Sequence, residues 1–479
     1  MANSTTSWRG YSDQTLIMKR IVASLGVAAL GAACIQESSA QATGAKAWTA
    51  SVALRGFYDD NVNTTPTARV GTFGAEVSPT LAFELPMDQT TVSLAYTYSF
   101  KYYEKPPQIG ADHNDQSHII TARLMHAFNE RTTISIGDSF VIGQEPDVLR
   151  AGNTIDTIQR LSGENIRNYG NITLNHQFSP KFGMEVGYVN SFFDYEDNLS
   201  SSPSYGVFDP LGLPWPNFLG LPPAGVGISR SGLLDRIEQT VHLDARWTLQ
   251  SSTIALVGYA ISLANYTADE PIGIVNLIDP ADSSFNYVIP SNSRDALSHY
   301  VYVGAEHTFR PDLFGSLRVG ARFTDYFNSP AKESGVSPYV AASLHYSYGK
   351  DGNLQVGLSH DRSATDVFST QGGSGSITTD AESTTIYGSI THRILPDLFG
   401  TLMGQFQNST FNGGQFDSQS EQYYLMSVSL EYHINRHIST SVSYNFDRIV
   451  SDPHGIAGVP VITRGFDRNR IYVGATVTY

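Results

Sequence analysis

Apolar and polar side chains alternate strictly over residues 470–479. One face of this stretch holds Ile471, Val473, Ala475, Val477 and Tyr479. The other face holds Arg470, Tyr472, Gly474, Thr476 and Thr478. Successive side chains of a β-strand point to opposite faces, so the pattern predicts a strand that is apolar on one side only.

The same pattern recurs from Trp48 onward, in runs of about ten to fourteen residues. Two runs flank a tight turn, such as 86–89, and a longer polar or Gly/Pro-rich loop follows. We count about eighteen such strands, with sixteen as the alternative, joined by about eight short turns and about nine longer loops. The segment 307–317 recurs as 392–402, which predicts two similar hairpins at short turns.

Long loops at one end only favour a membrane barrel over a soluble β-sandwich. After residue 42 no apolar stretch is long enough for a membrane-spanning helix. A chain that enters a membrane through strands must close into a barrel, because only closure satisfies every backbone group in lipid. We therefore predict an antiparallel, up-and-down transmembrane β-barrel with short periplasmic turns and long extracellular loops.

The N-terminal region has the features of an export signal. Met18-Lys19-Arg20 is followed by an apolar run over 21–33, and Ala40-Gln41-Ala42 provides a cleavage site. We expect residues 1–42 to be an upstream extension plus signal peptide, with Met18 as the true start, and residues 43–479 to be one barrel domain. Cys34 leaves lipidation as an alternative, although its preceding residues fit a lipobox poorly.

Aromatic residues and charge agree with a barrel in the outer membrane. The chain has 26 Tyr and 24 Phe, and many lie near strand ends, where barrels carry aromatic girdles. The girdle candidates are Phe57, Phe83, Tyr102, Phe128, Phe178, Phe192, Phe309 and Tyr326. A net charge of −15 argues against nucleic acid as a partner. It suits contact with lipid and lipopolysaccharide, although ordinary acidic solubility explains it equally well.

If the apolar face contacts lipid, the opposite face lines a lumen wide enough for water. The pore-lining candidates are Arg55, Arg123, Arg167, His242, Asp244, Arg246, Arg318, Arg322, His345, Asp361 and Arg393. The arginines could attract anionic sugars or acids, or they could pair with neighbouring carboxylates across the wall. A continuous arginine ladder would favour a conduit for an acidic polysaccharide, and scattered ion pairs would favour a general channel.

Two long loops are candidates for narrowing or covering the pore. The loop 145–164 carries a set of charged residues that suits an inward-folded constriction: Asp147, Arg150, Asp156, Arg160 and Glu164. The segment 209–223 is too apolar for a solvated loop tip. It would plug the mouth, cover a neighbouring subunit or contact a partner, and the sequence does not choose among these.

Catalytic and cofactor chemistry find little support. No GxSxG, HExxH or phosphate-binding loop occurs, and we expect no enzyme activity, no cofactor and no metal site. Acidic pairs such as Asp59-Asp60 and Asp269-Glu270 could hold Ca²⁺, but solvated acidic loops are the preferred interpretation.

The first strand ends in Arg55-Gly56-Phe57-Tyr58-Asp59-Asp60-Asn61-Val62-Asn63, and this resembles the opening of the putative β-barrel porin 2 family. The hairpin pattern and the final strand ending at Tyr479 also resemble outer-membrane barrels, in which such a strand is the assembly signal. The resemblance implies an outer-membrane barrel of Gram-negative bacteria and supplies no catalytic residues.

The expected function is a porin-like channel for passive diffusion of small polar solutes. The alternatives are a conduit for an acidic exopolysaccharide and a plugged structural barrel. Expected partners are lipid, lipopolysaccharide, the barrel assembly machinery, a second copy of the chain and a polysaccharide.

Overall fold

Eighteen antiparallel strands form one closed sheet in the computed structural model, and two further strands form a separate hairpin. The structure describes residues 46–107, 112–144, 154–157, 164–196, 231–267, 269–276, 286–349, 351–369, 376–451 and 464–479. The first nine strands are β1 Trp48–Asp59, β2 Thr72–Pro86, β3 Thr90–Tyr103, β4 Asn114–Asn129, β5 Thr132–Gly143, β6 Asn165–Ser179, β7 Phe182–Tyr195, β8 Arg236–Gln250 and β9 Thr253–Tyr266. The other nine barrel strands are β12 Ala296–Arg310, β13 Leu313–Asp325, β14 Ser334–Tyr348, β15 Gly352–Ser363, β16 Asp380–Leu395, β17 Leu398–Asn412, β18 Ser420–Asn435, β19 Ile438–Ser451 and β20 Asp467–Thr478.

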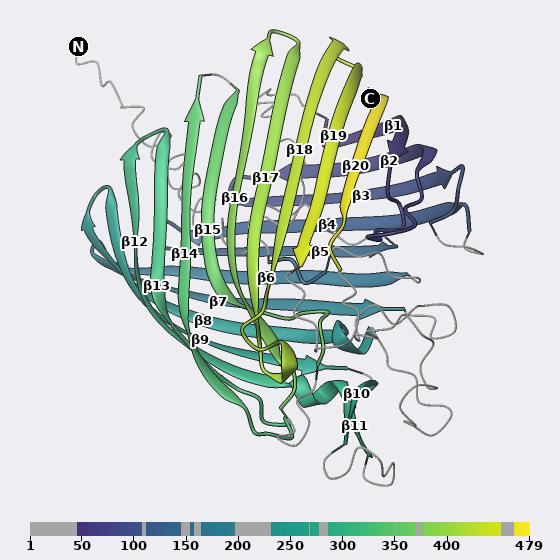
Figure 1. The fold of residues 1–479 in the computed structure, drawn as a ribbon. Coiled ribbons are helices and arrows are strands. Elements are labelled where there is room, and N and C mark those ends of the chain that lie inside the picture. The colour runs from purple at the N-terminus through teal and green to yellow at the C-terminus, as the bar shows by residue number, and fades with distance from the viewer. Residues whose placement is uncertain are drawn as a thin grey trace, which may run out of the picture.

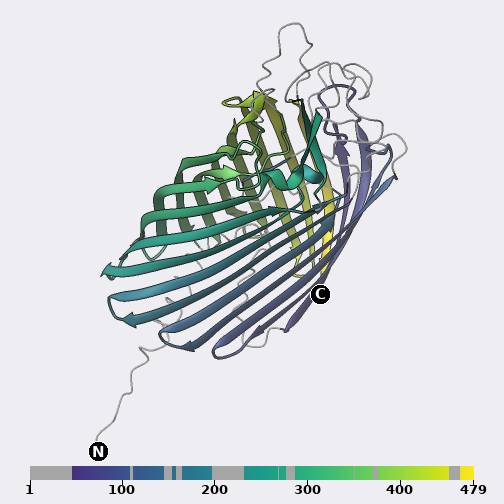
Figure 2. The ribbon, with the colours of Figure 1, turned by 90° about the horizontal axis from the view of Figure 1, so that it is seen from below.

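The barrel closes where β1 pairs with β20. Their antiparallel register runs from Ser51 opposite Thr478 to Asp59 opposite Arg470. The Tyr479 amide donates to the Ala50 carbonyl at 2.8 Å, and the Tyr479 ring packs on Trp48 with centroids 5.7 Å apart. Figure 1 shows β20 beside β1, and Figure 2 shows the strands wrapping around the barrel. The predicted up-and-down barrel of about eighteen strands is confirmed.

Turns and loops separate to the two ends of the barrel. Short turns join β2–β3, β4–β5, β6–β7, β8–β9, β12–β13, β14–β15, β16–β17 and β18–β19. The opposite end carries the hairpin of β10 Pro271–Asn276 and β11 Asn286–Pro290, together with the one-turn helices η2 Ser231–Leu233, η4 Ser291–Arg294 and η5 Gly414–Phe416. Figure 1 shows β10 and β11 at the end away from the C-terminus. Among the described residues no helix is long and apolar enough to cross a membrane.

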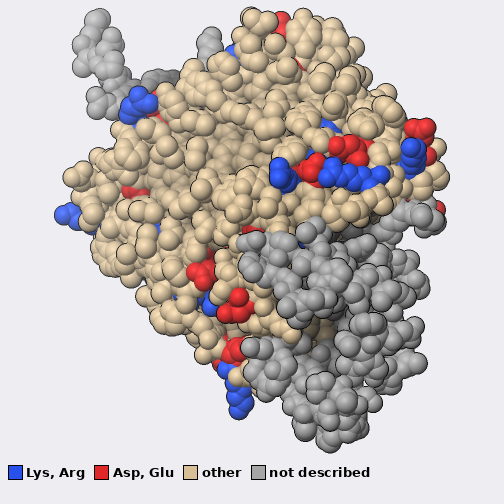
Figure 3. All heavy atoms as spheres, in the orientation of Figure 1, with Lys and Arg blue, Asp and Glu red and all other residues tan. Residues whose placement is uncertain are grey.

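The outer surface of the barrel is an apolar band. Along β12 the outward side chains of Val301 and Val303 are 52% and 59% exposed, and the intervening Tyr302 is buried inside. The face in Figure 3 carries few charged side chains over its described strands, and those present gather in small patches. Because an apolar surface of this extent is unfavourable in water, it indicates contact with hydrocarbon.

Most of the predicted girdle residues lie on this outer face, but two do not. Phe83, Tyr102, Phe128, Phe178 and Phe309 are all at least 40% exposed. Phe57 and Tyr326 are instead buried inside, at 6% and 3% exposure, so their prediction as girdle residues was wrong. Phe57 lies two residues after the inward-facing Arg55, and Tyr326 lies four residues after the inward-facing Arg322. Because side chains alternate with a period of two, both rings point to the inside.

Candidate functional site

The inner face of the barrel holds every predicted pore-lining position. By strand alternation these residues lie on the side opposite the exposed apolar residues of the same strands. Arg55 and Arg123 are exposed towards the lumen, whereas Arg167 and Asp244 are buried at 4% and 1% exposure. His345 also lies on the inner face, on β14. Whether these residues contact a passing solute stays a prediction.

A network of charged side chains joins strands β7, β8, β12 and β13 on the inner wall. Arg246 bonds the carboxylates of Glu185 and Glu306, at 3.0 and 2.5 Å. His242 Nε2 lies 3.5 Å from Glu185. Asp244 accepts from the Tyr302 hydroxyl at 2.5 Å and lies 3.5 Å from Arg318. The arginines here are paired with carboxylates rather than arranged as a free cationic ladder.

A second group of ion pairs lies nearer the extracellular end. Arg322 bonds Asp361 at 3.0 Å, and Asp361 also accepts from the Tyr300 hydroxyl. Arg362 pairs with Asp380 at 3.3 Å. Neither Arg362 nor Asp380 was among the pore-lining residues predicted from the sequence.

Arg393 occupies an inward position but does not lie along the lumen wall. Its guanidinium bonds Asp351 at 2.7 Å and the Pro396 carbonyl, both in periplasmic turns. Because Arg393 is only two residues from the end of β16, its long side chain reaches the rim of the barrel. It therefore ties two turns together at the periplasmic end.

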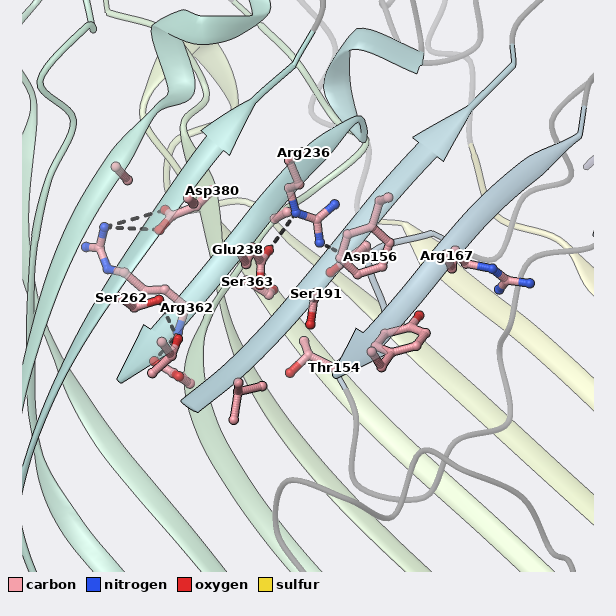
Figure 4. A pocket seen from close by; sticks show the side chains of 18 of the residues that line it. Thr154, Asp156, Arg167, Ser191, Arg236, Glu238, Ser262, Arg362, Ser363 and Asp380 are labelled. Atoms are coloured by element: carbon pink, nitrogen blue, oxygen red, sulfur yellow. Dashed lines mark hydrogen bonds and ion pairs between the residues drawn. The ribbon is translucent and has the colours of Figure 1, made fainter. Parts of the chain in front are cut away.

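A short segment of the predicted constriction loop lies inside the barrel. The Ile155 amide donates to Gln407 Oε1 at 2.7 Å, and Gln407 Nε2 donates to the Ile155 carbonyl at 2.9 Å. Asp156 bonds Arg236 on β8, which also bonds Glu238 at 2.6 Å. Figure 4 shows Arg236 between Glu238 and Asp156.

These contacts carry residues 154–157 across the lumen, from β8 on one side to β17 on the other. Of the other predicted loop residues, Glu164 directly precedes β6 and its carbonyl accepts from the Glu196 amide. The remaining three, Asp147, Arg150 and Arg160, lie outside the described residues. Neither Arg236 nor Gln407 was predicted, although Gln407 shares a face with lumen positions on β17.

Two cavities lie at successive heights in the lumen. The larger, of about 410 Å³, is lined by Asp156 and Arg236 together with Tyr300 and Arg322. The smaller, of about 190 Å³, lies towards the short turns and is lined by Arg246 and Glu306 among others. On β12 the residue Tyr302 lies between the two levels, where its hydroxyl bonds Asp244. The lumen is therefore subdivided by charged and phenolic side chains.

This geometry, a closed barrel with an apolar outside and a polar, ion-paired inside, agrees with the family comparison. Residues 293–479 match the model of the putative beta-barrel porin 2 family. The match confirms the resemblance for this part of the chain, and the protein is an outer-membrane β-barrel. No curated protein matches the sequence.

Several solved outer-membrane proteins are similar to this porin-like chain. OpdK from Pseudomonas aeruginosa, solved with vanillate, is 9% identical with a TM-score of 0.38, over 90% of this chain and 99% of that one. A BenF-like porin from Pseudomonas fluorescens is 10% identical with a TM-score of 0.38, again over 90% and 99%. The ferric enterobactin receptor PfeA from Pseudomonas aeruginosa is 9% identical with a TM-score of 0.41, over 91% and 81%.

The opening motif lies outside the matched residues, and the structure gives it a role in closing this porin-like barrel. Asp59 receives three contacts of 2.5 to 3.1 Å from the Arg468 guanidinium on β20. Asp60 accepts from the backbone and side-chain amides of Asn469, each at 2.7 Å. Asn61 donates to the Asp467 carbonyl at 3.0 Å. The Asp-Asp-Asn sequence thus fastens the first strand to the last.

Extracellular segments form a cap with its own apolar core. Its buried residues come from the end of β7, from η2, from β10–β11 and from the segments after β15: Phe193, Tyr195, Leu233, Leu234, Ile272, Ile289, Phe368 and Ile377. Gly273 permits close approach here, because a Cβ would lie 2.0 Å from the Phe368 ring. Arg294, 1% exposed, donates to the carbonyls of Leu233, Thr365 and Thr379 at 2.9 to 3.1 Å.

The carboxyl group of Asp235 is buried under this cap. It accepts from the Tyr195 amide at 2.7 Å, and burial raises its pKa to about 8. Asp295, which accepts from the Tyr266 amide, also has its pKa raised by burial. The apolar segment 209–223 lies outside the described residues, so its predicted packing stays a prediction.

Proposed function

We propose that the protein is a weakly selective outer-membrane channel through which small polar solutes diffuse passively. The observation that carries the proposal is the pairing of three lumen arginines with carboxylates inside a closed barrel. Arg246, Arg318 and Arg322 each face a carboxylate partner within 3.5 Å. Paired charges leave little net field for selecting anions or cations, while their polar atoms still bind water and hydroxyl groups.

The larger cavity supports a small solute rather than a polymer. Its volume of about 410 Å³ is in the range of small-molecule sites, and residues 154–157 cross the lumen beside it. A conduit for an acidic polysaccharide would benefit from a continuous row of unpaired arginines, which the ion pairs disfavour. The plugged structural barrel is the other candidate, and the apolar cap favours it.

Single-channel conductance in planar bilayers separates these functions. We expect the refolded wild-type protein to conduct, with a reversal potential close to zero in a KCl gradient. Two matched variants split one ion pair: Asp361→Asn leaves the Arg322 cation, and Arg322→Gln leaves the Asp361 anion. The first should shift the channel towards anions and the second towards cations.

Strong anion selectivity of the wild-type channel, little altered by Arg322→Gln, would instead favour the polysaccharide conduit. The absence of conductance in the wild type and both variants, with correctly folded barrels, would favour a structural barrel and overturn the proposal.

Targeting and partners complete the proposed function. We propose cleavage of a signal peptide after Ala42, assembly through the strand ending at Tyr479, and no enzymatic activity. Contact with lipopolysaccharide and association with a second copy of the chain are also proposals. N-terminal sequencing of the protein from outer membranes would test the cleavage site.

A further inference from the structure

Six of the periplasmic hairpins share one irregularity. In each, the strand register skips one residue just before the turn. The skipped residues are all apolar: Phe128, Phe178, Leu249, Phe309, Ile394 and Ile434. The repeated sequence at 307–317 and 392–402 is therefore part of a wider hairpin geometry. Two residues before the skipped position, four of the six hairpins carry a histidine.

Three of these histidines, His126, His176 and His307, have the same surroundings. Each lies directly opposite the threonine that begins a neighbouring strand. Their Nδ1 atoms lie 2.7, 2.9 and 2.8 Å from the hydroxyls of Thr90, Thr132 and Thr253, respectively.

Each of the three rings also contacts the skipped phenylalanine edge-on. The centroids lie 4.6, 4.5 and 4.5 Å apart. The fourth histidine, His392, bonds the Tyr348 hydroxyl at 3.2 Å and stacks on its ring. Two contacts thus hold each imidazole in a fixed orientation.

All four histidines lie on the outer face at one depth. Each is three residues before the end of its strand, on the same side as the apolar band. On β12 the outward residues run Val301, Val303, Ala305, His307 and Phe309 towards the periplasmic turn. In transmembrane barrels, outward-facing residues at this depth lie at the boundary between hydrocarbon and the head groups of the periplasmic leaflet.

We propose that these histidines form a belt of binding sites for the phosphate groups of periplasmic-leaflet phospholipids. Where the threonine hydroxyl donates to Nδ1, the proton of the neutral ring is on Nε2, which can then donate to a phosphate oxygen. Among the described residues, no hydrogen bond engages Nε2 of these four rings.

The adjoining turns supply charge complementarity for an anionic head group. Each of the four hairpins carries a cation within the five residues that follow its histidine: Arg131, Lys181, Arg310 and Arg393. Acidic residues are also present in three of the turns. Arg310 is paired with Asp312, and Arg393 is paired with Asp351. The phosphate is therefore bound by the histidine, and the turn cation adds longer-range attraction at low salt.

The competing role is purely structural, in which the threonine and phenylalanine contacts only stiffen the hairpin. Two substitutions separate the roles. Asparagine places an amide where Nδ1 lies and keeps the threonine bond, but has nothing at the position of Nε2. Glutamine reaches the position of Nε2 with an amide donor and gives up the threonine bond.

The test uses the full chain and native mass spectrometry with two added lipids of equal acyl chains, phosphatidylglycerol and the phosphate-free digalactosyl diacylglycerol. We expect the wild type to prefer phosphatidylglycerol. Each histidine-to-asparagine substitution at 126, 176 and 307 should weaken the binding of phosphatidylglycerol about threefold, and the glutamine substitutions should weaken it less. The lumen-facing variant His345→Asn should leave the preference unchanged.

An asparagine triple variant that keeps the preference for phosphatidylglycerol would overturn the proposal. So would equal losses with asparagine and glutamine for both lipids, because that result identifies a stiffening role. If the triple variant fails to fold, the single variant His307→Asn gives the same comparison.

Discussion

The buried contact between Asp59 and Arg468 should be a major determinant of barrel stability. The two side chains are only 2% and 3% exposed, and three nitrogen–oxygen contacts of 2.5 to 3.1 Å join them. Asp59→Ala removes the carboxylate but leaves the guanidinium buried at the junction of β1 and β20. Truncating one member of a buried pair costs about 3–5 kcal/mol, and we expect a loss of this size in the free energy of unfolding.

The same junction contains its own control. Arg69 and Asp467 also bond across it at 2.9 Å, but they are 39% and 40% exposed, so Arg69→Ala should cost about 0–1 kcal/mol. Urea unfolding in phospholipid vesicles measures both variants, and an unchanged m-value would show that the folded barrel still closes. Replacing both members of the buried pair by apolar side chains, as Asp59→Leu with Arg468→Met, should recover most of the loss. The reasoning is refuted if Asp59→Ala costs no more than Arg69→Ala.

Three other perturbations address the band, the cap and its titration. Val303→Arg places a charge in the middle of the apolar band and should lower the free energy of unfolding in vesicles by about 2–4 kcal/mol. Val336→Arg, near the extracellular rim, should lower it by about 0–1 kcal/mol, and equal costs would contradict the assigned depth. Arg294→Ala removes three bonds to cap carbonyls, so limited proteolysis should cut the extracellular loops faster than in wild type, while Arg436→Ala in a periplasmic turn should not change that rate. Asp235 has a pKa of about 8 in the folded protein and 3.8 in the unfolded chain. Between these values the folded state retains a proton that the unfolded state loses, so stability should fall as the pH rises from about 4 to 8. Asp235→Asn should flatten that part of the thermal-unfolding profile, and an unchanged slope would exclude Asp235 as its source.

Local alternation was enough to predict the barrel. Period-two patterning placed Val52, Leu54 and Val473 on the outside, and loop lengths separated the two ends of the molecule. The errors at Phe57 and Tyr326 came from giving position near a strand end more weight than alternation itself, which points both rings inward. The β10–β11 hairpin within an extracellular loop was not predicted, because its strands are only six and five residues long.

The site was less predictable because its decisive contacts join distant parts of the chain. Gln407 and Ile155 are 252 positions apart, and the glutamine bonds backbone groups that any residue would offer. Arg294 likewise binds three carbonyls, and a carbonyl acceptor leaves no side-chain signature in the sequence. The sequence can place an arginine on the lumen face. Whether its guanidinium is free to contact a solute or is paired with a carboxylate depends on the register of the neighbouring strands.

The junction of β1 and β20 also constrains how the molecule can form. Residues that meet there are 409 positions apart, whereas each hairpin pairs neighbours in sequence. Until that meeting, an otherwise complete sheet presents two unpaired edges, which are templates for adhesion to other chains. Contacts of such sequence separation are slow to form. We therefore expect the nearly finished sheet to be the long-lived species during biogenesis, and its two edges to be what a folding catalyst must shield.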